Sequence, residues 1–306
     1  MKAVRIHKHG GSDDLVLEDA PPPHAATGDV VVRVHAAGFV PDELEWPGTW
    51  VDRAGRDRTP SIPAHEVAGV VTEVRYGTTG LAVGDRVFGL TDWHRDGAAA
   101  EYVAVEARNL TRMPDSLTFV EAAALPLSGL TAWQGLFVHG GLEPGQRVVV
   151  HGAGGGTGTL AVQLARQAGA HVIATGRGRV ADLAAELGAH TFVDLERQRF
   201  EDAVEPVDLV FDTIGGDLLA RSAALVRPGG TLVSITAPPP VEPESGRALF
   251  FIVEPNRDQL AELARRAASG DLRAHVGAVH PLAEAREAFR AKHNGVPGKV
   301  VLEIRR

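Results

Sequence analysis

The stretch that decides the fold is VVVHGAGGGTGTLAVQLARQAGAHVIATGRGR, residues 148–179. Its first residues, Val148–Val150, form a β-branched apolar run that favours a buried parallel strand. The glycine cluster Gly152–Gly158 follows directly, and Leu160 and Leu164 then repeat at helical spacing. A second apolar run closes the stretch. This order of strand, glycine turn, helix and strand is typical of a unit that binds a dinucleotide.

The glycine turn carries the pattern Ala153-x-Gly155-x-x-Gly158, with alanine in the place of the first glycine. Glycines in such a turn let the backbone approach a pyrophosphate and let the helix pack closely on the strand, while the helix N-terminus attracts the anion. A glycine-rich turn before any helix can produce the same pattern, but the flanking strands favour the dinucleotide interpretation. The residues expected to contact the cofactor are Ala153, Gly154, Gly155, Gly156, Thr157 and Gly158.

The end of the second strand indicates which cofactor binds. An acidic side chain at this place accepts hydrogen bonds from the ribose of NAD, whereas an arginine accommodates the 2′-phosphate of NADP. The sequence here is Thr175-Gly176-Arg177-Gly178-Arg179, which contains no carboxylate. Because a guanidinium binds a phosphate in a bidentate manner, these residues favour NADP(H) over NAD(H), with Thr175 as a hydroxyl partner. The alternative is a solvated basic turn at a helix start. The expected cofactor contacts are Thr175, Gly176, Arg177 and Arg179.

Composition narrows the chemistry and the partners. The 306 residues include no cysteine, which excludes disulfides, thiolate nucleophiles and cysteine-ligated zinc. The chain is long enough for two domains, and its 44% hydrophobic content is ordinary for a globular protein. A net charge of −8 without a basic cluster argues against nucleic acid or a membrane surface as the partner. Because no apolar run is long enough to span a membrane and Met1 opens no signal-peptide pattern, we expect a cytoplasmic protein.

The rest of the chain divides into two patterns. Short strand and turn signals dominate the first third, which predicts a β-rich domain. After the dinucleotide unit, apolar strand signals alternate with helical ones, which predicts a doubly wound parallel sheet with its ligand at the carboxyl ends of the strands. Ile214, Ser234 and Thr236 follow such ends, although ordinary strand-to-loop punctuation gives the same pattern. Strand signals at residues 276–279 and 299–304 are expected to return to the first domain.

A series of further motifs runs along the chain in one order. They are Ile62–Val71 (IPAHEVAGVV), Gly84–Val87 (GDRV), Leu130–Trp133 (LTAW), the glycine loop, Arg227–Gly230 (RPGG) and Gly298–Val301 (GKVV). With these motifs the sequence resembles the medium-chain dehydrogenase/reductase superfamily, in its zinc-less branch similar to quinone oxidoreductases. The resemblance implies an α/β protein with two domains. Residues 1–117 and 271–306 would form a GroES-like partial β-barrel that binds substrate, and residues 118–270 a Rossmann doubly wound parallel sheet that binds NADP(H).

The resemblance implies two further features. It places Thr131 near the nicotinamide, and Phe250, Phe251 and Val253 are expected to reach over that ring from the last strand of the sheet. Relatives in this superfamily commonly form homodimers through the edge strands of the Rossmann sheet. The apolar run at 248–253 is the candidate edge, so we expect a homodimer.

The resemblance also bears on the metal. Zinc-dependent relatives hold catalytic zinc through three residues, and the corresponding places in this sequence carry Val40, His65 and Leu127. Valine and leucine cannot donate to a metal, and a catalytic zinc needs about three protein ligands. We therefore expect no metal, with His65 and the adjacent Glu66 as hydrogen-bonded structural residues. The alternative is an unusual site from His65, Glu66, Asp42 and His94.

Without a metal, hydride transfer must rely on positioning and on hydrogen-bond donors aimed at the substrate oxygen. Quinones and α,β-unsaturated carbonyls suit this best, because the product anion is delocalised. Zinc-less relatives often carry an asparagine where this chain has Val40, so that polar role does not transfer. The substrate-pocket candidates are Val40, Asp42, Trp46, Trp50, Trp93 and His94. Tryptophans there could stack a flat conjugated substrate, or they could pack a domain seam or an oligomer interface.

We expect a zinc-independent, NADPH-dependent oxidoreductase that transfers hydride to quinones or to enones and enals. No residue is assigned as a catalytic acid, since water can supply the proton to an enolate. Two alternatives stay open at this stage. One is a metal-free alcohol or aldehyde oxidoreductase, and the other is a non-catalytic sensor that binds NADPH.

Overall fold

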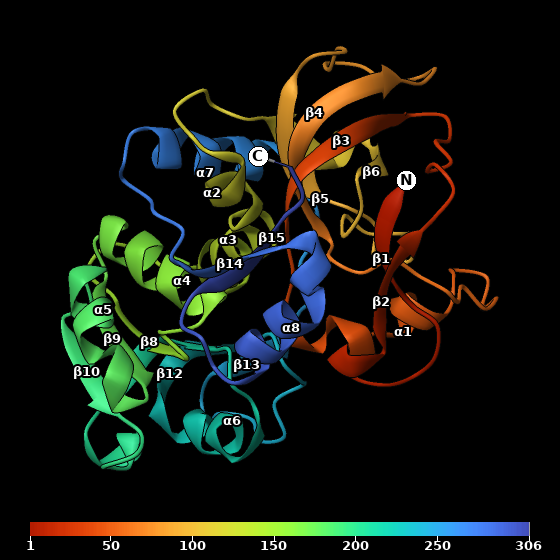
Figure 1. Ribbon diagram of the computed structural model, residues 1–306. Coiled ribbons are helices and arrows are strands. Elements are labelled where there is room, and N and C mark those ends of the chain that lie inside the picture. Colours follow the sequence, from red (N-terminus) through yellow and green to blue (C-terminus); the bar gives the residue numbers. More distant parts are fainter. Residues whose placement is uncertain (306) are drawn as a thin grey trace. The chain divides into compact units, whose positions relative to one another are not determined.

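The computed structural model describes residues 1–305 and divides into two compact units, each built on its own sheet (Figure 1). Unit 1 comprises Met1–Leu127 and Pro255–Arg306, and unit 2 comprises Ser128–Glu254. The expected fold class is confirmed, because one sheet is largely antiparallel and the other is a doubly wound parallel sheet. The domain limits expected from the sequence, 1–117 with 271–306 and 118–270, stay a prediction, since compactness does not define which residues bind substrate or cofactor.

Unit 1 contains a seven-stranded sheet in the order β14-β15-β3-β4-β5-β7, and β6 also pairs with β3. Its strands are β3 (Asp29–Gly38), β4 (Glu66–Val74), β5 (Arg86–Leu90), β6 (Tyr102–Glu106), β7 (Leu110–Arg112), β14 (Val276–Pro281) and β15 (Lys299–Glu303). A separate antiparallel pair joins β1 (Lys2–Ile6) and β2 (Leu15–Asp19). Because β15 pairs with β3, the end of the chain returns to the first domain, as the sequence predicted.

The core of unit 1 follows from strand alternation. Val30, Val32 and Val34 are fully buried at every second position of β3, because alternate side chains of a strand point to the same face. The ring of Phe289 stacks on Phe39 at 3.9 Å between centroids and attaches the last helix to this core. The helices are α1 (Pro47–Trp50), α2 (Phe119–Ala123), α7 (Arg257–Ala268) and α8 (Ala285–His293), with the short 3-10 helices η1 (Ser12–Asp14), η2 (Pro41–Glu45), η3 (Ala107–Asn109) and η8 (Leu282–Glu284).

Unit 2 contains a six-stranded parallel sheet in the order β10-β9-β8-β11-β12-β13. The strands are β8 (Arg147–His151), β9 (His171–Gly176), β10 (Thr191–Asp194), β11 (Val207–Asp212), β12 (Val226–Ser234) and β13 (Arg247–Phe250). The strand order reverses between β8 and β11. The strands β9 and β10 lie on one side of β8, and β11, β12 and β13 lie on its other side. Such a switch point is where parallel sheets bind ligands.

The helices of unit 2 pack on this sheet, with α4 on β8 and β9, α5 on β10 and α6 on β12 (Figure 1). Their bounds are α4 (Gly156–Gln167), α5 (Ala181–Glu186) and α6 (Gly216–Ser222), and α3 (Pro126–Trp133) precedes them. Unit 2 also contains the π-helix η4 (Gln134–His139) and the 3-10 helices η5 (Gly178–Val180), η6 (Phe200–Asp202) and η7 (Ala223–Leu225). Among residues 1–305, no helix is long and apolar enough to cross a membrane.

A buried ion pair joins distant parts of unit 1. Glu66, the first residue of β4, pairs with Lys299, the first residue of β15, and both side chains are almost completely buried. The Lys299 ammonium also donates to the carbonyl of Phe39 at 2.9 Å, and the Glu66 carboxylate accepts the N–H of Leu127 at 3.0 Å. One pair therefore fixes the end of β3, the start of β4, the start of β15 and the segment that leads into α3.

Breaking this pair should destabilise the protein strongly, because one charge is left buried without its partner. We expect Lys299→Met to lower the free energy of unfolding by about 3–5 kcal/mol in urea denaturation. The double variant Glu66→Leu with Lys299→Met should recover much of the loss, since it removes both charges. Lys2→Met is the control, because Lys2 and Asp19 form an exposed pair worth at most about 1 kcal/mol. A Lys299→Met protein as stable as the unaltered one would contradict this account.

Candidate functional site

The glycine loop connects β8 to α4 and folds back on the end of β9. Gly152 begins it with φ of +79°, in the left-handed region that favours glycine. The N–H groups of Gly152 and Ala153 both donate to the carbonyl of Thr175, at 3.1 and 3.0 Å. The N–H of Gly155 donates to the carbonyl of Gly152 at 2.9 Å, which closes the turn in front of the helix. The loop is therefore held to two neighbouring strand ends.

Close packing at Gly158 fixes the helix above the turn. A Cβ atom on Gly158 would lie 2.1 Å from the carbonyl oxygen of Gly152, so no larger residue fits without a backbone shift. Ala153 is fully buried, which explains how alanine can stand in the place of the first glycine. The first N–H groups of α4 have no partners within the helix and point out of its N-terminus. This arrangement can bind an anionic group such as a pyrophosphate.

Under the loop lies a buried histidine that the sequence did not single out. His151 ends β8 with no exposed surface, and burial lowers its pKa to about 3, so the ring is neutral. Its Nδ1 lies 2.8 Å from the hydroxyl of Thr175, and its Nε2 lies 3.0 Å from the hydroxyl of Ser222. Because Ser222 donates to the carbonyl of Leu218, its oxygen accepts from His151 Nε2, and Thr175 donates to Nδ1. The only sequence signal was a polar residue at the end of a valine run.

The expected 2′-phosphate contacts separate into two groups. Thr175 and Gly176 are buried, and the Thr175 hydroxyl is turned inward to His151. Arg177 and Arg179 are both exposed, on the turn that follows β9. At this strand end it is therefore the two arginine side chains that are exposed to solvent. Direct binding of the cofactor by the Thr175 hydroxyl stays a prediction.

The remaining cofactor candidates all belong to unit 2. Ile214 and Thr236 are exposed on the loops after β11 and β12, whereas Ser234 is buried at the end of β12. Phe250 is 36% exposed at the end of β13. Three others are buried, and their contact with a cofactor stays a prediction: Thr131 in α3, and Phe251 and Val253 after β13. The strand itself ends at Phe250, three residues before the end of the expected apolar run.

The substrate candidates belong to unit 1 and fall into two environments. The indole of Trp46 lies edge-on to that of Trp93 at 5.8 Å and stacks on His65 at 6.1 Å, and both tryptophans are half-buried. Trp50 lies in the core, where its Nε1 donates to the carbonyl of Leu44 at 3.0 Å. Half-buried rings can offer a face to a ligand, which a core ring cannot.

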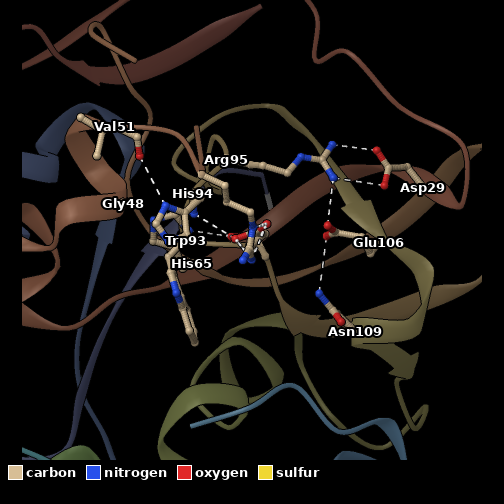
Figure 2. A network of polar contacts seen from close by, with 12 residues as sticks. Asp29, Gly48, Val51, His65, Trp93, His94, Arg95, Glu106 and Asn109 are labelled. Atoms are coloured by element: carbon tan, nitrogen blue, oxygen red, sulfur yellow. Dashed lines mark hydrogen bonds and ion pairs between the residues drawn. The ribbon is translucent and has the colours of Figure 1, made fainter. Parts of the chain in front are cut away.

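Ion pairs hold the loop that carries Trp93 and His94. Figure 2 shows Arg95 bound to both oxygens of buried Asp29, at 3.1 and 2.7 Å, and also paired with Glu106 at 3.3 Å. On the other side, His94 Nδ1 lies 3.4 Å from the carbonyl of Val51 (Figure 2). Further pairs join Asp92 to Arg53 and Asp96 to Arg58. The two aromatic side chains therefore project from a loop with little freedom to move.

The turn that begins at Val40 depends on a carboxyl group that the sequence did not reveal. Val40 precedes η2 and is half-buried, and Asp42 within η2 is exposed. Glu43 is buried, and its carboxyl oxygens accept the N–H groups of Ala64 at 2.6 Å and Val40 at 3.3 Å. Burial raises the pKa of Glu43 to about 8. A glutamate three residues after the start of the turn was the available signal, although Val40 lacks the side-chain acceptor of a complete capping box.

The residues at the zinc positions of this fold do not fit a zinc ion. Val40 and Leu127 have no donor atom, and the Glu66 carboxylate is occupied by Lys299. His65 is buried, with a pKa lowered to about 3 by burial, and its Nδ1 lies 2.7 Å from the hydroxyl of Thr91. Across residues 1–305, no three side chains of histidine, cysteine, aspartate or glutamate are grouped to hold a metal, so the alternative set of His65, Glu66, Asp42 and His94 is not assembled.

Comparison with known proteins gives matches over both units. Residues 26–115 match the family model described as alcohol dehydrogenase GroES-like domain, and residues 187–302 match the one described as zinc-binding dehydrogenase. A probable zinc-binding oxidoreductase of Arthroderma benhamiae is 32% identical over 311 residues, which cover 95% of this chain and 92% of the relative.

The names of two further similar proteins specify a cofactor or a class of substrate. An NADPH-dependent alkenal/one oxidoreductase from the chloroplast of Arabidopsis thaliana is 32% identical over 315 residues, covering 99% of this chain and 79% of the relative. Among solved structures, the quinone oxidoreductase of Coxiella burnetii has a TM-score of 0.92 at 28% identity, covering 100% of this chain and 99% of that one.

The glycine loop allows a direct test of its geometry. We expect Gly158→Ala to weaken binding of NADPH at least about tenfold and to lower the free energy of unfolding by about 1–3 kcal/mol, because the new methyl group displaces the Gly152 carbonyl. Gly11→Ala in unit 1 is the control, since a Cβ atom there would meet no atom within 4 Å and Gly11 has φ of −90°. Fluorescence titration with NADPH and urea denaturation measure the two effects. Equal behaviour of the two variants would contradict the importance of this contact.

Proposed function

Because the chain belongs to the medium-chain dehydrogenase/reductase superfamily, we propose that it is a zinc-independent, NADPH-dependent oxidoreductase that transfers hydride to quinones or α,β-unsaturated carbonyls. The observation that carries this proposal is the glycine loop of unit 2, with two exposed arginines on the turn after β9. The nicotinamide, when bound, supplies the hydride. The protein supplies the cradle for the pyrophosphate, the cofactor preference and the surface that receives the acceptor.

Cofactor preference follows from charge and shape. Arg177 and Arg179 each carry a guanidinium group, which can bind two oxygens of a phosphate at once. In the printed sequence, no acidic residue stands between Thr175 and Arg179 to bind the ribose hydroxyls of NAD. The relative from Arabidopsis thaliana carries NADPH in its name, which supports the same preference.

Independence from zinc follows from the donor set. The side chains of Val40 and Leu127 cannot ligate a metal, and His65 is hydrogen-bonded to Thr91. Conjugated acceptors do not need a Lewis acid, because the charge that arrives with the hydride spreads into an enolate or a hydroquinone. The names of the Arabidopsis and Coxiella proteins, an alkenal/one oxidoreductase and a quinone oxidoreductase, agree with this class of acceptor.

Substrate recognition is assigned to the half-buried aromatic side chains of unit 1. Trp46 and Trp93 offer ring faces on which a flat conjugated acceptor can stack, and an indole N–H or the His94 ring can donate to its oxygen. Because Arg95 is bound to Asp29 and Glu106, the adjacent Trp93 and His94 side chains are positioned before the substrate arrives. Preorganised donors act most strongly where charge develops during the reaction.

The proposal extends to the assembly of the protein. Strand β13 is the last strand in the order of the unit 2 sheet, and Phe250 at the end of β13 is partly exposed. Edge strands expose N–H and carbonyl groups that can pair with another strand. We therefore keep the homodimer through this edge, and the cytoplasmic location, as proposals.

A substrate panel tests the reaction. The absorbance of NADPH should fall with quinones and enones as acceptors, and this loss should be unaffected by a strong zinc chelator. Consumption with saturated aldehydes alone would favour the metal-free alcohol or aldehyde oxidoreductase. Binding of NADPH without turnover of any acceptor would favour a sensor. Stoichiometric zinc in the purified protein, lost together with activity on chelation, would contradict zinc independence.

Cofactor preference has its own test. Replacing both Arg177 and Arg179 by alanine should lower kcat/KM for NADPH by about 10- to 100-fold and leave that for NADH within about twofold, because only NADPH carries the 2′-phosphate. Arg166→Ala is the control, since Arg166 is an exposed arginine in the last turn of α4, at the other end of that helix from the glycine loop. An equal loss with both cofactors would show that the arginines act on stability and not on the phosphate.

A further inference from the structure

The strands of unit 2 end in a row of buried polar side chains. In the register of the sheet, Thr175 of β9 lies beside His151 of β8, His151 beside Asp212 of β11, and Asp212 beside Ser234 of β12. None of these four side chains has exposed surface. Neighbouring residues of parallel strands point to the same face, so the row lies directly under the loops at the carboxyl edge.

Asp212 is the acceptor that these loops share. One carboxylate oxygen accepts the N–H of Ile214 at 3.3 Å, and both accept the N–H of Gly215, at 3.2 and 3.0 Å. The second oxygen also accepts the hydroxyls of Ser234 at 3.2 Å and Thr236 at 3.4 Å. A single carboxylate therefore joins the loop after β11 to the loop after β12.

The neighbouring residue extends this connection to the glycine loop. The hydroxyl of Thr213 donates to the carbonyl of His151 at 2.8 Å, directly before Gly152. The N–H of Ile235 donates to the backbone carbonyl of Asp212 at 3.2 Å, so the loop after β12 is held through both the backbone and the side chain of Asp212. Three loops at the switch point of the sheet are thus fixed to one another through residues 212 and 213.

Burying the Asp212 carboxylate costs free energy, because the group loses its hydration. Desolvation raises its pKa, while the four donors lower it. A buried carboxylate without enough donors is strongly unfavourable, so each of these hydrogen bonds contributes to keeping the group in place. A side chain without an acceptor oxygen would remove the partner that Asp212 gives to the N–H of Gly215 and the hydroxyl of Ser234.

We propose that Asp212 is a positioning residue for cofactor binding, which holds the loops after β11 and β12 at a fixed spacing so that both can contact the cofactor together. This inference rests on the proposed function, because Ile214, Ser234 and Thr236 are the expected cofactor contacts of those loops. Asp212 itself makes no contact with the cofactor. Its removal should therefore change the affinity for NADPH and not the hydride transfer at saturation.

The test compares two buried aspartates of the same strand. Asp212→Asn keeps the size of the side chain but turns one acceptor into a donor, and we expect the Kd for NADPH to rise about tenfold with kcat at saturating NADPH within about threefold. Asp208→Asn is the matched control, because Asp208 is buried near the start of β11, where it accepts the N–H of Arg147 at 2.8 Å. Its Kd for NADPH should stay within about twofold of the unaltered protein.

A double-variant cycle separates positioning from general destabilisation. Ser234→Ala should raise the Kd for NADPH by itself but add little in the Asp212→Asn background, since both changes break the same connection. If Asp212→Asn does not fold, as judged by thermal denaturation, Thr213→Val carries the test, because it breaks the connection of the same loop to His151 without removing an expected cofactor contact. The expected rise in Kd is about fivefold.

Three results would overturn the inference. Asp212→Asn, or Thr213→Val in its place, could bind NADPH as tightly as the unaltered protein. Asp208→Asn could weaken binding as much as Asp212→Asn, which would indicate a loss of stability alone. Absence of NADPH binding to the unaltered protein would overturn the proposed function and this inference together, whereas the first two results leave the proposed function standing.

Discussion

The hydrogen bonds among buried polar side chains at the carboxyl edge of the parallel sheet are the constraint on which unit 2 depends. A buried polar group without a partner is costly, and Thr175, His151, Asp212 and Ser234 are each hydrogen-bonded there. Their partners are one another, Ser222 of α6, and the loops that begin at the same strand ends. The requirement to satisfy buried groups thereby determines the shape of the surface where a dinucleotide is proposed to bind.

Unit 1 uses charge for the same purpose. The pair of Glu66 and Lys299 joins segments that lie more than two hundred positions apart in the sequence, and the pair of Arg95 and Asp29 holds the loop of Trp93. Buried ion pairs are seldom a large net source of stability, but they are specific, because a charge without its partner is costly. In both units, polar contacts that fix geometry lie beside the residues proposed to act.

The positions that the resemblance assigns to zinc ligands show how such a framework can persist with different side chains. Relatives named for zinc match this chain closely enough to show a common family, yet Val40 and Leu127 offer no donor atoms. The adjacent polar residues have structural partners, with His65 bound to Thr91 and Glu66 to Lys299. The Glu66 carboxylate can therefore stabilise the fold without binding a metal. The lack of donor atoms at Val40 and Leu127 supports an acceptor whose product anion is stabilised by its own conjugation.

The sequence by itself determined the strand, glycine turn and helix of residues 148–167, the fold class and the family, because glycine spacing, strand periodicity and motif order can be recognised along the chain. It also marked Arg177 and Arg179. Only the tertiary structure decided that Thr175 turns inward to His151, that Trp50 belongs to the core while Trp46 does not, and that Asp212 joins two loops. Those outcomes depend on which residues from distant strands lie side by side. The order of residues along the chain does not show which positions of neighbouring strands pair.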